Sequence, residues 1–376
     1  MRVLIGGDFC PENRAEKLLS NGGQVFSIDY LRVWKSSDFR IVNLEGPITS
    51  SDSKIDKVGR HIKFNPSIMC GLKKMGVTHF SLANNHIMDY GERGVNDTIY
   101  YLKKYGIEYF GCHAQKESVL VKDDTKVVML SFSNKEFSLM EDNKGIGACS
   151  MDLIHMFQKI EAAKALTKHI VVILHTGLSM HPLPSPEQRK LCKFLIDIGV
   201  SVVLCQHSHI MGAYESYKDG FISYGQGSFV FELNRKDSVW NQGYSIDLKI
   251  ENDKRTVNII PHRQFDNTLS VRNLTQSEFE QFEVSMQKIN KVLEDEDQFK
   301  KEWTIYLKKV EKYYFNQFFL PKNRGIRKIL NLVSFKNLLS NNKRKVMLNN
   351  IRNDEHAEVM KELLRRENNE KSAFFK

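Results

Sequence analysis

The chain has 376 residues, of which 41% are hydrophobic and 27% are charged, values that fit a soluble globular protein. No apolar run approaches the roughly 18 residues of a membrane-spanning helix, and an apolar strand begins at Val3, so we expect neither a membrane span nor a signal peptide. The six cysteines include no Cys-x-x-Cys pair, which argues against a zinc ribbon or a disulfide framework and favours a reducing cytosol.

The net charge of +10 is concentrated in one segment of the chain. Residues 300–345 contain 13 Lys and Arg against two Glu, so the remainder is close to neutral. A basic surface attracts nucleic acid or anionic membranes, because both carry dense negative charge. That inference therefore applies to the segment 300–345 alone.

Strands and helices alternate over the first two thirds of the chain and are then followed by hairpins. The strands are predicted at residues 3–5, 37–47, 77–83, 107–111, 118–121, 127–132, 169–175 and 200–205, and then at 214–217, 221–224, 229–233, 244–251 and 256–261. The helices between them are predicted at residues 14–20, 66–75, 91–105, 151–168 and 187–199. This order predicts an α/β fold with mixed sheets.

After Arg263 the strand signals end and helical patterns take over. The helices are predicted at residues 277–293, 299–319, 324–339 and 354–366. We therefore predict a boundary near residue 265, with one domain over 1–265 and a basic helical region over 266–376.

Seven polar residues stand at or just after the ends of predicted strands: Asp8, Glu45, Asn85, His86, His175, His207 and His209. In open α/β sheets, ligand sites lie just beyond the carboxyl ends of the strands. The pair His207 and His209 is the most suggestive, since alternate residues of an extended strand project to the same side. Each residue alone has an ordinary structural explanation, as a turn, a cap or a solvated charge. Together their carboxylates and imidazoles predict a two-metal hydrolytic centre.

The order and spacing of these motifs resemble the CapA family of poly-γ-glutamate and capsule synthesis proteins, whose fold is that of calcineurin-like metallophosphoesterases. The matching motifs are Gly7-Asp8, Val42-Asn43-Leu44-Glu45, Leu82-Ala83-Asn84-Asn85-His86 with Asp89-Tyr90-Gly91, His175-Thr176-Gly177 with Pro184-Ser185-Pro186, and Gln206-His207-Ser208-His209 with 224–231. The resemblance implies two mixed β-sheets flanked by helices, followed by an α-helical C-terminal extension.

The resemblance also implies two divalent metal ions, of which Mn, Fe and Zn suit carboxylate and imidazole ligands. The implied ligands are Asp8, Glu45, Asn85, His175, His207 and His209. Glu45 would bridge, Asp8 and His209 would serve the first ion, and the other three would hold the second. His86 would face the substrate, with Asp89 orienting it.

Two further residues flank the Pro-rich loop near this site, and we consider His181 and Arg189 as candidates for substrate contact. Many phosphoesterases carry a His two residues after the first Asp, where this chain has Cys10. That departure concerns the first metal position.

We therefore expect a cytosolic, metal-dependent hydrolase of a phosphoester, or of a related bond in a cell-surface polymer or its precursor, acting in capsule or exopolymer production. Two alternatives remain open. One is a noncatalytic accessory subunit of a polymer-synthesis complex, and the other is a nucleic-acid phosphoesterase, which the distance in sequence between the basic segment and the motifs disfavours. In residues 300–345 the cations alternate with aromatic residues, which predicts either a peripheral contact with anionic membrane or a partner, or ordinary packing.

Overall fold

The computed structural model describes residues 1–113, 115–139, 145–232, 239–266, 268–318 and 340–373. The chain divides into two compact units. The first unit comprises Met1–Ile55 and His61–Glu294, and the second comprises Asp56–Arg60 and Asp295–Lys376.

The first sheet of the first unit has eight strands in the order β14-β13-β12-β1-β2-β3-β4, with β11 paired to β1 beyond this path. Its strands are β1 (Arg2–Cys10), β2 (Phe39–Leu44), β3 (His79–Ser81), β4 (Glu108–Phe110), β11 (Ser228–Phe231), β12 (Gln242–Glu251), β13 (Lys254–Gln264) and β14 (Val271–Asn273). Strands β1 to β4 are parallel, whereas β12 to β14 are antiparallel to their neighbours. The sheet is therefore mixed.

The second sheet has six strands in the order β5-β6-β7-β8-β10-β9. They are β5 (Glu117–Lys122), β6 (Thr125–Ser133), β7 (Ile170–His175), β8 (Val202–Gln206), β9 (Tyr214–Tyr217) and β10 (Gly220–Ser223). Strands β6, β7, β8 and β10 are parallel, and the edge strands β5 and β9 are antiparallel to them. This sheet is also mixed.

Side chains alternate between the two faces of each strand, and this alternation builds the layers. On β1, Leu4 packs in a cluster with helix residues such as Leu19 and Trp34. Its neighbours Val3 and Ile5 pack instead against apolar residues of β6, β7 and β8. The two sheets thus meet face to face, with helices on their outer faces, which confirms the predicted fold class.

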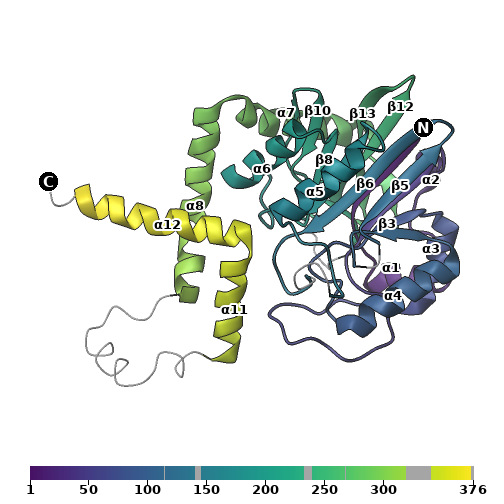
Figure 1. Cartoon of the computed structure of the whole chain (residues 1–376), viewed down its shortest axis with the longest axis horizontal. Helices are drawn as coiled ribbons and strands as arrows, with labels where there is room; N and C mark the ends of the chain where they lie inside the picture. The colour runs from purple at the N-terminus through teal and green to yellow at the C-terminus, as the bar shows by residue number, and fades with distance from the viewer. Residues whose placement is uncertain (114, 140–144, 233–238, 267, 319–339, 374–376) are drawn as a thin grey trace. The chain divides into compact units, whose positions relative to one another are not determined.

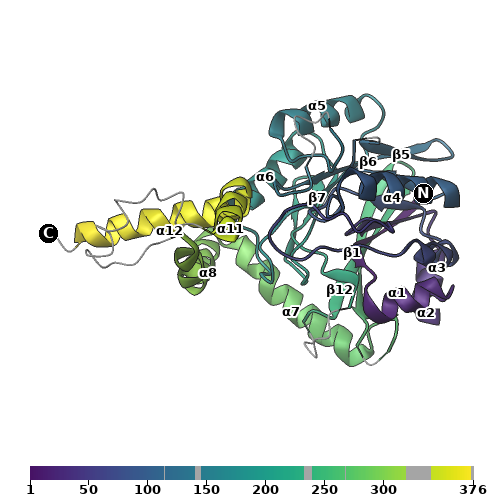
Figure 2. The same cartoon turned by 90° about the horizontal axis from the view of Figure 1, so that it is seen from below.

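The outer helices are α1 (Asn13–Ser20), α2 (Ile28–Lys35), α3 (Met69–Met75), α4 (Gly91–Tyr105), α5 (Leu153–Lys164) and α6 (Pro186–Asp197), with a short 3-10 turn at Pro66–Ile68. In Figure 2, the strands lie between α5 and α6 on one side and α1 to α3 on the other. Helix α6 begins at Pro186 because Ser185 accepts a hydrogen bond from the backbone N–H of Gln188 at 3.2 Å.

The structure divides the chain at Glu294 and Asp295 rather than near residue 265. Strand β14 pairs with β13, and helix α7 (Gln276–Glu294) buries Phe282 and Met286 in the core between the sheets. Residues 266–294 therefore belong to the first unit. A three-residue strand gives almost no sequence signal, and helical periodicity does not reveal which surface a helix covers.

The second unit contains α8 (Glu296–Phe318), α11 (Asn341–Arg352) and α12 (Asp354–Ala373). Trp303, Leu307 and Tyr314 of α8 are buried, and the hydroxyl of Tyr314 is hydrogen-bonded to Nδ1 of His356 on α12. Part of the predicted aromatic stripe is thus packed. The predicted helix at 324–339 lies outside the described residues. Within the described part of the chain, none of the helices has the length and apolarity that a membrane span requires.

Candidate metal centre

The residues expected at the site lie at the carboxyl ends of five parallel strands from both sheets. Asp8 is near the end of β1, Glu45 follows β2, and Asn85 follows β3. From the second sheet, His175 ends β7 and His207 follows β8. The two sheets face each other, so these ends converge.

Two overlapping groups of side chains have ligand atoms within 4.8 Å of one another. The first group is Glu45, His175 and His207, and the second is Asp8, Glu45 and His209. Glu45 is shared by both. The structure therefore brings together these five predicted ligands in an arrangement with two adjoining positions for a cation.

Glu45 is fully buried, and neither oxygen of its carboxylate has a hydrogen-bond partner among the described residues. Burial, and then the negative charges of Asp8 and Asp89, raise the pKa of Glu45 well above its usual value. An ionised carboxylate in such a position is costly unless it is paired or binds a metal. A divalent cation would satisfy both oxygens, so this residue fits the implied metal.

Asp8 is held by three contacts. Its oxygens accept hydrogen bonds from Nδ2 of Asn43 at 2.9 Å and from the backbone N–H of His207 at 3.0 Å, and Oδ2 lies 3.4 Å from Nδ1 of His209. Burial alone would raise the pKa of Asp8, but the contact with His209 and the nearby imidazoles lower it well below its usual range. The carboxylate of Asp8 is thus ionised and held in one orientation, as a metal ligand would need to be.

His175 is the residue around which the first group, with Glu45 and His207, converges. Its Nε2 atom lies 3.0 Å from Oδ1 of Asn85, 3.2 Å from Nδ1 of His207 and 3.8 Å from Oε1 of Glu45. Burial lowers the pKa of His175 well below its usual value. The neutral imidazole is the form that binds metal ions, so burial favours ligation.

His207 and His209 reach the centre from a turn after β8 and not from an extended strand, as the sequence had predicted. Strand β8 ends at Gln206, so the two histidines do not share one face of an extended strand. Their φ angles are +89° and +59°, in the left-handed region that residues other than glycine rarely adopt. Such strain is typical of functional sites. The ring of His209 also packs against Phe231 and Trp240, with centroid distances of 4.9 and 4.8 Å.

His86 lies beside this centre and is oriented by a buried carboxylate. Its Nδ1 atom is 2.8 Å from Oδ2 of Asp89, which also accepts a hydrogen bond from the backbone N–H of Ile62 at 2.7 Å. Asp89 has no exposed surface. The carboxylate therefore fixes the ring of His86 and favours a proton on Nδ1.

The structure separates the two candidates for substrate contact. The guanidinium of Arg189 is buried, pairs with both carboxylate oxygens of Glu215 at 3.0 Å, and donates to the carbonyl of Leu293 at 2.6 Å. Arg189 thus ties α6 to β9 and α7, and we no longer assign it to substrate. His181 is half-buried in the loop between β7 and α6 and stays a candidate.

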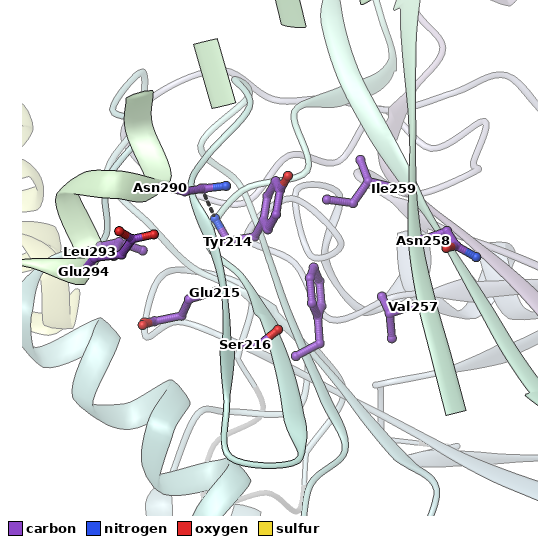
Figure 3. A pocket seen from close by; sticks show the side chains of 10 residues that line it. Tyr214, Glu215, Ser216, Val257, Asn258, Ile259, Asn290, Leu293 and Glu294 are labelled. Atoms are coloured by element: carbon purple, nitrogen blue, oxygen red, sulfur yellow. Dashed lines mark hydrogen bonds between the residues drawn. The ribbon is translucent and has the colours of Figure 1, made fainter. Parts of the chain in front are cut away.

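A cavity of about 600 Å³ lies between β9, β10, β13 and α7 (Figure 3). Its lining residues are Tyr214, Glu215, Ser216, Phe221, Val257, Asn258, Ile259, Asn290, Leu293 and Glu294. They include none of the strand-end ligands. Glu215, the partner of Arg189, is among them, which places Arg189 beside this cavity rather than among the ligands.

Three supporting residues escaped the sequence analysis as functional positions. Asn43 holds Asp8, and Asn84 donates to Oδ1 of Asn43 at 3.1 Å and to the carbonyl of Leu44 at 2.7 Å. Both residues lie inside the motifs that carry the family resemblance, and their positions in these motifs could have indicated a role at the site. Glu136 accepts from Nδ2 of Asn85 at 3.1 Å and has no such signal.

Residues 2–233 match the family described as bacterial capsule synthesis protein PGA_cap, and this match covers more than half of the chain. The chain belongs to this family.

Curated relatives in this family include the capsule biosynthesis protein CapA of Bacillus anthracis, which is 27% identical over 246 residues, covering 62% of this chain and 60% of the relative. The PGA biosynthesis protein CapA of Bacillus subtilis is 27% identical over 242 residues, covering 60% and 62%. A probable polyglutamine synthesis accessory protein of Mycobacterium tuberculosis is 25% identical over 212 residues, covering 52% and 56%. The match thus spans about three fifths of these relatives.

Similar solved structures include a putative 5'-nucleotidase from Staphylococcus aureus, with 14% identity, a TM-score of 0.46, and coverage of 78% of this chain and 58% of that one. The NAD nucleotidase of Haemophilus influenzae has 11% identity, a TM-score of 0.42, and coverage of 77% and 56%.

The buried carboxyl of Glu45 predicts how the folding stability of this protein, in its metal-free form, depends on pH. A group whose pKa is raised by folding stabilises the fold below its unfolded pKa, and that contribution is lost as the pH rises through the folded pKa. The contribution of Glu45 to the stability of the metal-free protein should therefore fall above about pH 4.5, by up to about 1.4 kcal/mol per pH unit. His175 has a lowered pKa, so its contribution is lost in the opposite direction, as the pH falls below 6.5.

Glu45→Gln isolates the carboxyl from the imidazole. Its metal-free form should lack the loss at rising pH and melt at a higher temperature than wild type at pH 7. Added Mn²⁺ should raise the melting temperature of wild type and not of the variant. Thermal unfolding from pH 5 to 8, with and without Mn²⁺, measures both effects. Parallel pH profiles for the two metal-free proteins would contradict the burial of an unpaired carboxyl.

Proposed function

We propose that this capsule-synthesis protein is a metal-dependent hydrolase of the phosphoesterase type. Its substrate would be a phosphoester, or a related bond in a poly-γ-glutamate-like or polysaccharide exopolymer or its precursor. The observation that carries the proposal is Glu45, a fully buried carboxylate shared by two ligand groups with neither oxygen hydrogen-bonded among the described residues. A purely structural role gives no reason to bury such a group.

The proposal assigns Asp8, Glu45 and His209 to one ion, and Glu45, Asn85, His175 and His207 to the other. When bound, ions of the Mn, Fe or Zn type supply Lewis-acid activation of a water and of the phosphoryl group. Asn43, which is itself held by Asn84, keeps the Asp8 carboxylate oriented toward the proposed metal centre.

His86 supplies the acid in this proposal. Asp89 holds Nδ1, so the opposite nitrogen, Nε2, can carry a proton to a leaving oxygen. As the leaving bond breaks, that proton prevents an alkoxide from forming. Asp89 stabilises the imidazolium before the transfer because its buried carboxylate lies 2.8 Å from the ring.

The second candidate is a noncatalytic accessory subunit of a cell-surface polymer synthesis complex. The name of the mycobacterial relative, an accessory protein, motivates it. The two candidates differ in one measurable respect. A hydrolase should bind up to two divalent ions per chain and cleave at least one nitrophenyl phosphoester faster than its Asp8→Ala variant. Metal-free protein that stays inactive after reconstitution with Mn²⁺, Fe²⁺ and Zn²⁺ would favour the accessory role.

We also propose that the basic segment 300–345 makes a peripheral contact with anionic membrane at the cytoplasmic face. Support comes from α8, whose exposed lysines include Lys300, Lys301, Lys308 and Lys309. Each cation near an anionic surface contributes about 1 kcal/mol, and salt screens the attraction.

Replacing these four lysines by glutamine should abolish most co-sedimentation of the full chain with anionic liposomes at low salt. A matched control removes four exposed lysines elsewhere, at Lys73, Lys74, Lys103 and Lys104. Equal losses in both variants would show that only net charge matters. Absence of wild-type binding at low salt would refute the membrane contact.

A further inference from the structure

Glu136 contacts the candidate metal centre from a loop that follows β6. Its Oε2 atom accepts a hydrogen bond from Nδ2 of Asn85 at 3.1 Å. The loop is tied to the site, because the backbone N–H of Glu136 donates to the carbonyl of Asn134 at 2.9 Å, and that of Asn134 donates to the carbonyl of His175 at 3.2 Å. The carboxylate is therefore held against Asn85, a predicted ligand of the second ion, by a loop that is anchored to the backbone of His175, another predicted ligand.

The contact decides which end of the Asn85 amide faces the metal position. An amide side chain has one end that donates and one that accepts, whereas an ionised carboxylate only accepts. With the NH₂ group on Glu136, the carbonyl oxygen Oδ1 faces Nε2 of His175 at 3.0 Å. The reversed amide would present NH₂ to the centre, and an NH₂ group has no lone pair to offer a cation.

We propose that Glu136 is a positioning residue that locks the Asn85 carbonyl oxygen onto the second metal position. This inference rests on the proposed function, because it assumes that the second position binds an ion. It goes further by assigning a role to a residue outside every strand-end motif.

The charge of Glu136 has a separate effect that the test must remove. Glu136 lies within electrostatic reach of Glu45, as does Glu12. Any negative charge near the centre attracts a cation, whatever it does to Asn85. The hydrogen bond and the charge therefore need separate variants.

Three variants separate them. Glu136→Leu removes both charge and acceptor, Glu136→Gln removes the charge but keeps an oxygen that accepts from Asn85, and Glu12→Gln removes a charge on another element. Co²⁺ serves as the probe, because its visible absorption reports the number of ligands. We expect Glu136→Leu to weaken the second equivalent of Co²⁺ by about 10- to 100-fold and to change its spectrum, as loss of an orienting partner does. Glu136→Gln and Glu12→Gln should stay within a few-fold of wild type.

A double substitution tests the route through Asn85. If Glu136 acts by orienting the amide, adding Glu136→Leu to Asn85→Ala should cause no loss of Co²⁺ affinity beyond the few-fold charge effect that Glu136→Gln measures. Circular dichroism and melting temperature verify folding, and Glu136→Ala replaces the leucine variant if that one fails to fold. Equal weakening by Glu136→Leu and Glu136→Gln, or additive losses in the double variant, would overturn the inference. Wild-type protein that binds no Co²⁺ would instead refute the proposed metal centre.

Discussion

His207→Ala should remove one of the two divalent ions proposed for this protein, and Asp8→Ala should remove the other. His207 belongs only to the group around His175, and Asp8 belongs only to the group around His209. Each substitution therefore leaves one group intact. Loss of a direct ligand should weaken the affected position by more than the roughly 10- to 100-fold that loss of an outer partner causes.

The measurement is the metal content per chain after purification without chelator and equilibration with a small excess of Mn²⁺. His169→Ala is the control, since His169 directly precedes β7, at the opposite end of the strand from His175, and is paired with Asp253 at 3.0 Å. The control should keep its full metal content. Full content in both site variants would contradict the ligand assignment, and loss in the control would indicate general unfolding.

His86→Ala should keep nearly all of its metal and lose about 10²- to 10⁴-fold in rate, the usual contribution of a general acid. His86 belongs to neither ligand group, and its Nδ1 is held by Asp89 at 2.8 Å. The loss should be smallest for nitrophenyl esters, because a good leaving group departs without a proton. It should be largest for alkyl esters, whose leaving oxygen needs one.

Asp89→Asn is the companion variant. It should lose less than His86→Ala, because the imidazole remains but its orientation and its charged form are less supported. Rates for a series of leaving groups, together with metal content, separate acid catalysis from site assembly. An equal loss across the series would indicate that His86 only orders the site. Loss of metal in His86→Ala would make it a ligand.

The parts of the site that could be predicted from sequence are those that follow strands. An apolar run such as 169–175 predicts a buried strand, and the polar residue that ends this strand lies at the edge of the sheet formed by the carboxyl ends of the strands. Several parallel strands end at one edge, so Asp8, Glu45 and His175 could be placed together without coordinates. The alternation of strands and helices, followed by hairpins, likewise predicted mixed sheets, whereas their number, two, was implied by the family resemblance.

Other features depend on contacts that periodicity does not encode. The left-handed backbone at His207 and His209 is set by the turn after β8, which the sequence analysis treated as strand. Arg189 lies near the Pro-rich loop in sequence, yet its guanidinium turns to Glu215. Glu136 reaches Asn85 across 51 residues of chain from a loop with no recognisable motif. The boundary near 265 was misplaced because α7 packs into the core between the sheets.

Electron paramagnetic resonance of Mn²⁺-loaded wild-type protein tests the central claim, which is that Glu45 is shared by two ions. We expect two equivalents of bound Mn²⁺ with an exchange-coupled spectrum, because one carboxylate would connect both ions. We expect the coupling to be lost in Glu45→Gln. The six-line spectrum of isolated Mn²⁺ at two bound equivalents, or no bound Mn²⁺ at all, would contradict it.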